Sequence, residues 1–280
     1  MTDSGPTSPV LRLGTRTSRL ALWQAHYVSD RLTDAWPDLR VELVPFVTKG
    51  DKTLDVALPA IGGKGVFTAE LERALREGSV DMAVHSLKDL PTDDPEGLTI
   101  GAIPPRGDAR DAWVCPAGTR LEALRPGAVV GTSSPRRAAQ ILRQRPDLKV
   151  RSVRGNVETR YRKAASGDYD ALVLAYAGLE RLGMSASVTY AFDARVMLPA
   201  PGQGALGVQI RQGDEKTHRY LATLDHAPTR RAVEAERYLL AALGGGCSAP
   251  IGAWADEAGD TLRLRARILS PDGANVVEVE

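Results

Sequence analysis

Between residues 10 and 183 the chain alternates short apolar runs with longer stretches that have a helical period. Apolar residues at helical spacing, such as Ala25, Val28 and Leu32, predict helices, and the short apolar runs predict strands. Alternating β and α units are typical of α/β domains, whose mostly parallel sheets carry helices on both faces and bind ligands beyond the carboxyl ends of the strands. The expected strands are 10–14, 41–47, 80–84, 98–103, 128–131, 149–153, 170–175 and 205–211, and the expected helices are 18–35, 66–77, 134–145, 156–166, 176–183 and 228–243.

Two breaks divide this pattern into units. Residues 104–110 and 198–204 are rich in proline and glycine, which mark turns and domain crossings. The tail after residue 243 alternates as β-strands and indicates a small unit at the carboxyl end. Residues 48–65 form a long, glycine-rich polar loop, which predicts a lid or a disordered segment. Pro45 predicts that its strand lies at the edge of a sheet, because proline has no N–H for the ladder.

The composition excludes several classes of protein. No run of 18 apolar residues is present, so we expect no transmembrane helix, and the start MTDSGPTSPV lacks the features of a secretory signal. Two cysteines, Cys115 and Cys247, exclude a disulfide framework and favour a reducing cytoplasm. The histidines and cysteines lack metal-ligand spacing, so no metal is expected. His85 is expected to be structural, and no internal repeat is visible.

Positive charge is concentrated in one part of the chain. Residues 131–166 contain ten basic and two acidic residues, a local net charge of +8 in a chain whose total is +1. This cluster is either a solvated helical face or a site for a polyanion. Sites for single-stranded nucleic acid usually interleave basic with aromatic residues, and Tyr161 is the one aromatic residue in this segment. The cluster therefore argues against nucleic acid as the ligand.

The segment 131–137, GTSSPRR, resembles the start of a helix that binds an anion. Ser134 suits the N-cap and Pro135 the first helical position. Free N–H groups at a helix start attract anions. Arg136 and Arg137 in the first turn have the wrong sign for the helix dipole, so we expect that an anion lies among them and that they matter little for stability.

Asn156 repeats this arrangement between Arg154 and Arg160. The sequence leaves open whether the anion is a phosphate, a carboxylate or a nucleic acid. A P-loop is excluded, because IGGKG at residues 61–65 lacks the upstream glycine and the following serine or threonine.

One carboxylate and one thiol are candidates for chemistry. Asp89 follows a predicted strand, and nearby cations favour the charged form of a carboxylate, which can stabilise a cationic intermediate or relay a proton. An ordinary salt bridge is the alternative. Cys247 follows three glycines, which favours an exposed thiol, whereas Cys115 suits a small buried position.

Nine segments in order resemble the porphobilinogen deaminase family, whose members are also called hydroxymethylbilane synthases. They run from Thr15 to Gly252 and are TRTSRLALWQAHYV, VTKGD, GGKGVFTAELE, VHSLKDLP, DARDAWV, VGTSSPRR, VRGNVETR, LPAPGQGALG and GGGCSAPIG. Pro135 departs from the family, which usually carries leucine there.

The resemblance implies an α/β fold with two periplasmic-binding-protein-like α/β domains and a small α+β carboxyl-terminal domain. Domain 1 would contain residues 1–104 and 200–222, with the mobile lid at 48–65. Domain 2 would be the arginine-rich residues 105–199, and domain 3 residues 223–280. The family continues past the position of Glu280 with a helix, so we expect this end to be truncated.

The resemblance also implies the activity. The protein would be a transferase that deaminates four porphobilinogen molecules and joins them head to tail into linear hydroxymethylbilane, with release of ammonia, in porphyrin and haem biosynthesis. A dipyrromethane cofactor would be attached through a thioether to Cys247, and Asp89 would be the catalytic residue that stabilises each cation formed when ammonia leaves. Every pyrrole carries two carboxylates, which explains the arginines, because guanidinium suits carboxylate binding. The residues expected to bind cofactor and substrate are Arg16, Ser18, Lys64, Ser86, Lys88, Thr132, Ser133, Ser134, Arg136, Arg137, Arg154, Asn156, Arg160, Arg181, Gln203 and Gly204.

The partners implied are few. The resemblance implies a cytoplasmic monomer that takes porphobilinogen as its small-molecule substrate, binds neither nucleic acid nor membrane, and passes its product to uroporphyrinogen-III synthase. A carboxylate-binding transport protein would share the fold, but it would need a secretion signal and no reactive Cys247. A nucleic-acid binder would use residues 131–166.

Overall fold

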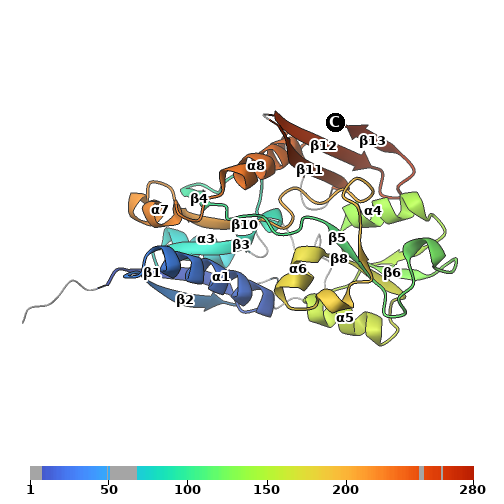
Figure 1. Cartoon of the computed structure of the whole chain (residues 1–280), viewed down its shortest axis with the longest axis horizontal. Helices are drawn as coiled ribbons and strands as arrows, with labels where there is room; N and C mark the ends of the chain where they lie inside the picture. The colour runs from blue at the N-terminus through green and yellow to red at the C-terminus, as the bar shows by residue number, and fades with distance from the viewer. Residues whose placement is uncertain (1–7, 49, 51–67, 246–248, 260) are drawn as a thin grey trace, which may run out of the picture.

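The computed structural model describes residues 8–48, 50, 68–245, 249–259 and 261–280. Its strands form two five-stranded sheets and one three-stranded sheet. Figure 1 shows the two larger sheets side by side, with the small sheet above them at the carboxyl end of the chain. The expected α/β class with a small α+β unit is therefore confirmed.

The elements follow the expected ranges closely. The strands are β1 (Val10–Arg16), β2 (Arg40–Phe46), β3 (Met82–Ser86), β4 (Leu98–Ala102), β5 (Asp111–Val114), β6 (Val129–Gly131), β7 (Lys149–Arg151), β8 (Ala171–Ala175), β9 (Tyr190–Ala191), β10 (Leu206–Arg211), β11 (Ile251–Ala258), β12 (Thr261–Leu269) and β13 (Val276–Val279). The α-helices are α1 (Arg19–Ala35), α3 (Ala69–Arg76), α4 (Pro135–Gln144), α5 (Val157–Ala165), α6 (Tyr176–Arg181), α7 (Glu215–Leu221) and α8 (Ala227–Ala242), and the 3₁₀ helices are η2 (Leu87–Asp89), η3 (Leu121–Ala123) and η4 (Ser185–Ser187).

The two five-stranded sheets have the same strand order. The first is β2-β1-β3-β10-β4 and the second is β7-β6-β8-β5-β9. In each sheet the fourth strand runs antiparallel to both neighbours, and the other strands share one direction. These reversed strands, β10 and β5, are the ones that follow the two breaks in the sequence pattern. The sheets are thus mostly parallel, as expected, with one reversed strand where the chain arrives from the other domain.

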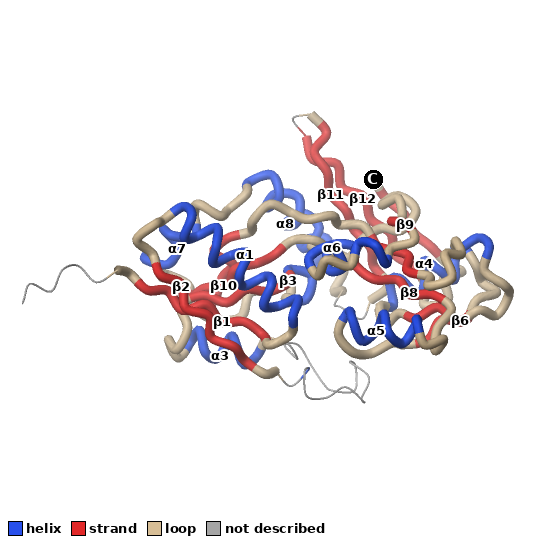
Figure 2. The backbone as a smooth tube through the Cα atoms, turned by 60° about the horizontal axis from the view of Figure 1, so that its bottom comes forward, coloured by secondary structure: helices blue, strands red, loops and turns tan. Residues whose placement is uncertain are grey.

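Helices cover both faces of each large sheet, as Figure 2 shows for α1 and α7 on one face and α3 on the other. The predicted apolar stripe of α1 is buried: Val28 and Leu32 pack with Leu13 in one core, while α3 packs in a separate core on the opposite face. Burial of each large aliphatic side chain contributes about 1.5–3 kcal/mol. Pro45 lies in β2 at the edge of its sheet, so that prediction is confirmed.

Besides the short 3₁₀ helices, two strands and one α-helix were absent from the sequence-based expectation. They are β5, β9 and α7. The first two contain four and two residues, too short to show a period, and α7 is mostly polar. Their place in the fold depends on neighbours that come from distant parts of the chain.

The small carboxyl-terminal unit is joined to both crossing segments through one buried acid. Glu236 of α8 is fully buried and accepts hydrogen bonds from the Arg106 guanidinium at 2.7 Å, the Gly202 N–H at 2.7 Å and the Ala255 N–H at 2.9 Å. One carboxylate therefore connects residues from both breaks and from β11. The strand order supports the proposed domain division, whose boundaries stay a prediction.

In the described part of the chain no helix is long and apolar enough to cross a membrane. The same residues contain no cluster of three or more His, Cys, Asp or Glu side chains placed to hold a metal ion.

Candidate active site

Asp89 ends the 3₁₀ helix η2, which directly follows strand β3. Two sets of contacts hold this turn in place. Leu87 is fully buried, and its N–H donates to the Ala205 carbonyl at 3.0 Å. The Arg237 guanidinium of α8 donates to the carbonyls of Leu87, Leu90 and Pro91. Asp89 itself is exposed. The fold thus presents this carboxylate on a fixed turn.

Cations from segments of both large sheets interact with the charge of Asp89. Burial, reinforced by the charge of Arg137, lowers the pKa of Lys88 to about 8, while the charge of Asp89 opposes this change. Burial also lowers the pKa of Arg160 to about 10, with Arg137 and Arg154 adding to the shift and Asp89 opposing it. Lys88 follows β3, whereas the three arginines lie on α4, on α5 or between β7 and α5. The structure therefore brings together one carboxylate and four of the predicted cations.

The predicted start of α4 is confirmed. Ser134 is the N-cap, its hydroxyl accepts the Arg137 N–H at 3.4 Å, and Pro135 is the first helical residue. Both Arg136 and Arg137 are buried against Asp111, so the protein itself supplies one counter-ion for the two guanidiniums. The expected external anion beside them stays a prediction. This internal pairing argues against their expected minor role in stability, which also stays a prediction.

Several predicted polar side chains are hydrogen-bonded within the protein. Some bonds are local: Ser18 and Asn156 cap α1 and α5, and Thr132 accepts the Ser134 N–H. Others join distant segments: the Ser133 hydroxyl donates to the Val153 carbonyl at 2.6 Å, just after β7, and Ser86 accepts from the Gln24 amide of α1. Their roles toward a ligand stay predictions.

Arg181 and Gly204 meet beside the crossing segments. Arg181 donates to the Gly204 carbonyl at 2.6 Å, and its guanidinium lies 5.4 Å from the ring centroid of Trp23. Gly204 has φ +86°, and an added Cβ would lie 2.6 Å from the Gly107 carbonyl oxygen. A side chain does not fit there, so Gly204 acts through its backbone.

His85 lies near the end of strand β3. His85 is buried, and burial together with the nearby charge of Arg16 lowers its pKa to about 4. The imidazole is therefore neutral at physiological pH. Arg16, at the end of β1, lies close enough for its charge to act on this ring.

Two important predictions lie outside the described residues. Lys64, with most of the expected lid at 48–65, is one, and Cys247 is the other.

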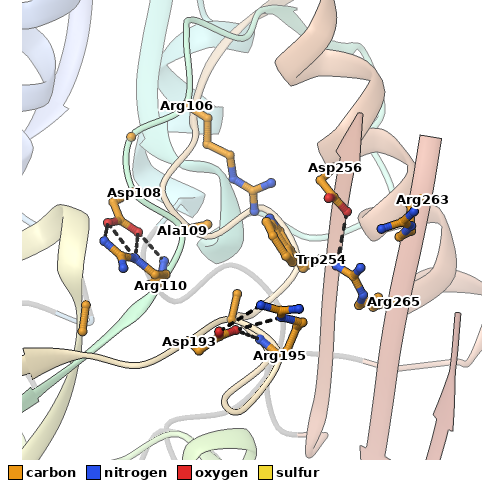
Figure 3. Close-up of a pocket in the computed structure, with 13 residues that line it drawn as sticks. Arg106, Asp108, Ala109, Arg110, Asp193, Arg195, Trp254, Asp256, Arg263 and Arg265 are labelled. Carbon is orange, nitrogen blue, oxygen red and sulfur yellow. Dashed lines mark hydrogen bonds and ion pairs between the residues drawn. The ribbon is translucent and has the colours of Figure 1, made fainter. Parts of the chain in front are cut away.

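A cavity of about 770 Å³ lies away from this cluster, between residues 106–110, residues 191–195 and the small sheet (Figure 3). Within the described residues, its lining includes none of the predicted site residues. Its acids pair with its arginines, as in Asp108–Arg110 at 2.6 Å and Asp256–Arg265 at 3.4 Å (Figure 3). The lining arginines without an aspartate partner there, Arg106 and Arg263, pair with Glu236 and Glu280. Because each lining arginine already has an acidic partner, the cavity is a poor site for a polyanion.

Sequence reasoning missed Asp111 and Arg237. Asp111 could have been found, because it begins the apolar run DAWV. If this run is a buried strand, its acidic side chain needs a positively charged partner. Arg237 lies in an ordinary amphipathic helix, and nothing in the sequence connects it with the turn at Asp89.

The pKa of Lys88 leads to a testable pH dependence. Below about pH 8 the ammonium is charged and attracts carboxylates, and above it the charge is lost, well before an unperturbed lysine with a pKa near 10.4 would lose it. We expect the apparent KM for an acidic substrate to rise above about pH 8 in the wild type. In Lys88→Arg the rise should move to higher pH, because guanidinium stays charged. Initial rates across pH 6–10 test this, and identical profiles in both proteins would contradict it.

Comparison with known proteins gives two family matches. Residues 11–219 match the family model described as porphobilinogen deaminase, dipyromethane cofactor binding domain, and residues 230–280 match the one described as porphobilinogen deaminase, C-terminal domain.

Among solved structures, the chain is similar to the VFT2 domain of BvgS from Bordetella pertussis, with 17% identity over 84% of this chain and 93% of that one and a TM-score of 0.45. It is also similar to the cofactor-binding domain of the Cbl transcriptional regulator, with 15% identity, coverage of 79% and 90%, and a TM-score of 0.48. The third structure is the effector-binding domain of BenM with its effector benzoate. It has 17% identity over 85% of this chain and 95% of that one, with a TM-score of 0.46. No function follows from likeness at this level.

Proposed function

Because the chain belongs to the porphobilinogen deaminase family, we propose that Asp89 and the cations around it are the site where it carries out the family's reaction. The protein assembles a linear tetrapyrrole from porphobilinogen in porphyrin biosynthesis. The observation that carries the site assignment is that the charges of Lys88, Arg137 and Arg160 all act with Asp89, while Arg154 acts on Arg160 beside them.

The residues around Asp89 fit an acidic pyrrole cofactor. A dipyrromethane built from two porphobilinogen units carries acetate and propionate groups, and the site offers three arginines and one lysine to bind them. Arginine is well suited to carboxylates, because its planar fork donates two parallel hydrogen bonds. We propose that Cys247 attaches this cofactor through a thioether. When bound, the cofactor supplies the pyrrole carbon to which the first substrate unit is joined.

Asp89 has a different task from the cations. Loss of ammonia from the substrate creates positive charge on the pyrrole, and a fixed carboxylate stabilises that charge without reorganisation. The carboxylate of Asp89 also accepts hydrogen bonds from pyrrole N–H groups. The anchoring of its turn by Arg237 and Leu87 keeps the carboxylate in place while the product grows.

We further propose that the protein is a hydroxymethylbilane synthase that works as a cytoplasmic monomer in haem biosynthesis and passes its product to uroporphyrinogen-III synthase. The two cysteines support a reducing compartment. The short life expected of a linear, reactive tetrapyrrole supports a consuming enzyme downstream.

Incubation with porphobilinogen tests the function directly. We expect four ammonia molecules for every linear tetrapyrrole, detected by ammonia assay and by mass spectrometry of the quenched product. A protein that only binds carboxylates would hold porphobilinogen and release no ammonia, which would overturn the proposal.

A further inference from the structure

Asp111 is a buried acid shared by two buried arginines. It begins β5 with 0% exposure, and Arg136 and Arg137 are 3% and 6% exposed. Its Oδ2 accepts from Arg136 Nη1 at 2.6 Å, and its Oδ1 accepts from Arg137 Nε at 2.8 Å. Burial alone would raise the pKa of Asp111, but the charges of Arg136 and Arg137 outweigh it and hold that pKa well below its usual range. The three residues therefore form a buried group of net charge +1.

The terminal N–H groups of Arg136 are all hydrogen-bonded within the protein. Its Nη1 donates to Asp111 and to the Leu198 carbonyl, and its Nη2 donates to Asp111 and to Gln203 Oε1. A guanidinium has four terminal N–H bonds, so all are occupied. Its Nε lacks a hydrogen-bond partner among the described residues but is itself buried. Arg136 has no terminal N–H left for a ligand.

Arg137 is bonded differently. Its Nε donates to Asp111, its Nη1 to the Val173 carbonyl at 3.2 Å, and its Nη2 to Gln203 Oε1 at 3.2 Å. Nη2 also lies 2.8 Å from Asp111 Oδ1, so Nη1 is the terminal nitrogen that keeps an N–H without a hydrogen-bond partner in the part of the chain that the structure describes. The charges of both arginines lower the pKa of Lys88, but Arg137 is the one whose charge also acts with Asp89 and on Arg160. Arg137 is therefore the arginine that is coupled to the carboxylate of the site.

We infer that Asp111 is a positioning residue that holds Arg137 with its remaining Nη1 N–H toward the carboxylates of the cofactor, and that Arg136 is a structural cation. This inference rests on the proposed function. Gln203 completes the arrangement from the second crossing segment: its Nε2 donates to Asp111 Oδ1 at 2.8 Å, and its Oε1 also accepts from Lys88 Nζ at 3.4 Å. Gln203 is fully buried, so it acts through its neighbours rather than on a ligand.

The inference assigns opposite phenotypes to two neighbouring arginines. Replacing either one leaves Asp111 paired with the other, so neither change exposes a lone buried charge. Arg136→Met loses four internal hydrogen bonds and no contact with the site. Arg137→Met loses its bonds to Asp111, Val173 and Gln203 together with the Nη1 N–H available to a carboxylate.

The experiment compares Arg136→Met, Arg137→Met, Asp111→Asn and the double variant Asp111→Asn/Arg137→Met, with Asp108→Asn as control. Asp108 lies three residues earlier in the same segment and pairs with Arg110 at 2.6 Å. For each purified protein, cofactor occupancy is measured by intact-protein mass spectrometry and the unfolding temperature by thermal denaturation. Steady-state assays give KM and kcat.

We expect Arg137→Met to reduce occupancy and to raise KM by roughly tenfold or more, as expected for loss of a charge-assisted bond. Arg136→Met should unfold at lower temperature while the folded fraction keeps normal occupancy and KM. Asp111→Asn should resemble Arg137→Met in occupancy and KM, and adding it to Arg137→Met should cause no further loss of either. Asp108→Asn should match the wild type.

Three results would overturn the inference. Equal loss of cofactor in the Arg136 and Arg137 variants would make Arg136 a ligand. Normal occupancy and KM in folded Asp111→Asn would remove its positioning role, and an additional loss in the double variant would show that Asp111 acts apart from Arg137. If Asp111→Asn does not fold, the comparison of the two arginine variants decides. A wild type without cofactor or turnover would instead refute the proposed function, and the unfolding temperatures would still test whether Arg136 is structural.

Discussion

Protein purified from a Cys247→Ser variant should lack the mass of two pyrrole units that the wild type carries, and it should lose tetrapyrrole synthesis. A serine hydroxyl at neutral pH is a far weaker nucleophile than a thiolate, so the thioether does not form. Without an attached pyrrole the first substrate has no carbon to join. We expect the loss of activity to be essentially complete.

Cys115→Ser is the matched control for this experiment. Cys115 is buried in domain 2, where its Sγ donates to the Asp170 carbonyl at 3.3 Å, a bond that a serine hydroxyl can also make. Intact mass and product formation should therefore be close to wild type. An unmodified Cys247→Ser protein with normal activity, or a cofactor mass that follows Cys115, would refute the attachment site.

Asp89→Asn should keep the fold and the cofactor and lose most of its turnover. The amide has nearly the same volume as the carboxylate, so the substitution tests charge alone. Asp89 is exposed on a turn held by backbone and Arg237 contacts, which the substitution leaves intact. Removal of one preorganised electrostatic group typically costs about 10²–10³ in rate. We therefore expect kcat to fall by roughly that factor with a smaller change in KM.

Asp94→Asn controls for the loss of a negative charge near this turn. Asp94 is exposed and accepts only the Thr99 hydroxyl, at 3.4 Å, among the bonds described for it. Single-turnover and steady-state rates, measured on proteins of equal cofactor content, separate chemistry from loading. Near-normal turnover in Asp89→Asn would end the catalytic assignment.

The local elements were predictable because their signals are local. Ser134 and Pro135 mark the start of α4, and Asn156 marks the start of α5, since a cap needs a partner only three residues away. The apolar period of α1 predicted its buried face in the same way. Such signals depend on a few neighbouring residues, so the chain shows them directly.

The shared strand order of the two large sheets was not predictable in this way. The second sheet repeats the order of the first, yet the segments show no repeat by eye, because many apolar residues satisfy the same buried positions. The reversed strand in each sheet depends on where the chain returns after a crossing. That is a property of the path through space rather than of any short segment.

The sequence by itself determined the element types, the family and the residues capable of the chemistry: a carboxylate at Asp89, a thiol at Cys247 and an excess of arginine in residues 131–166. Only the tertiary structure decided how those arginines divide. Arg136 and Arg137 are adjacent and chemically identical. Asp111, Gln203 and the Leu198 carbonyl occupy all the terminal N–H bonds of Arg136, whereas Arg137 keeps one on Nη1 within the described residues. Asp111 lies 25 residues before Arg136, and Gln203 lies on the second crossing segment. A buried charge is fixed by the counter-ion that folding brings to it, and that partner is set by long-range packing.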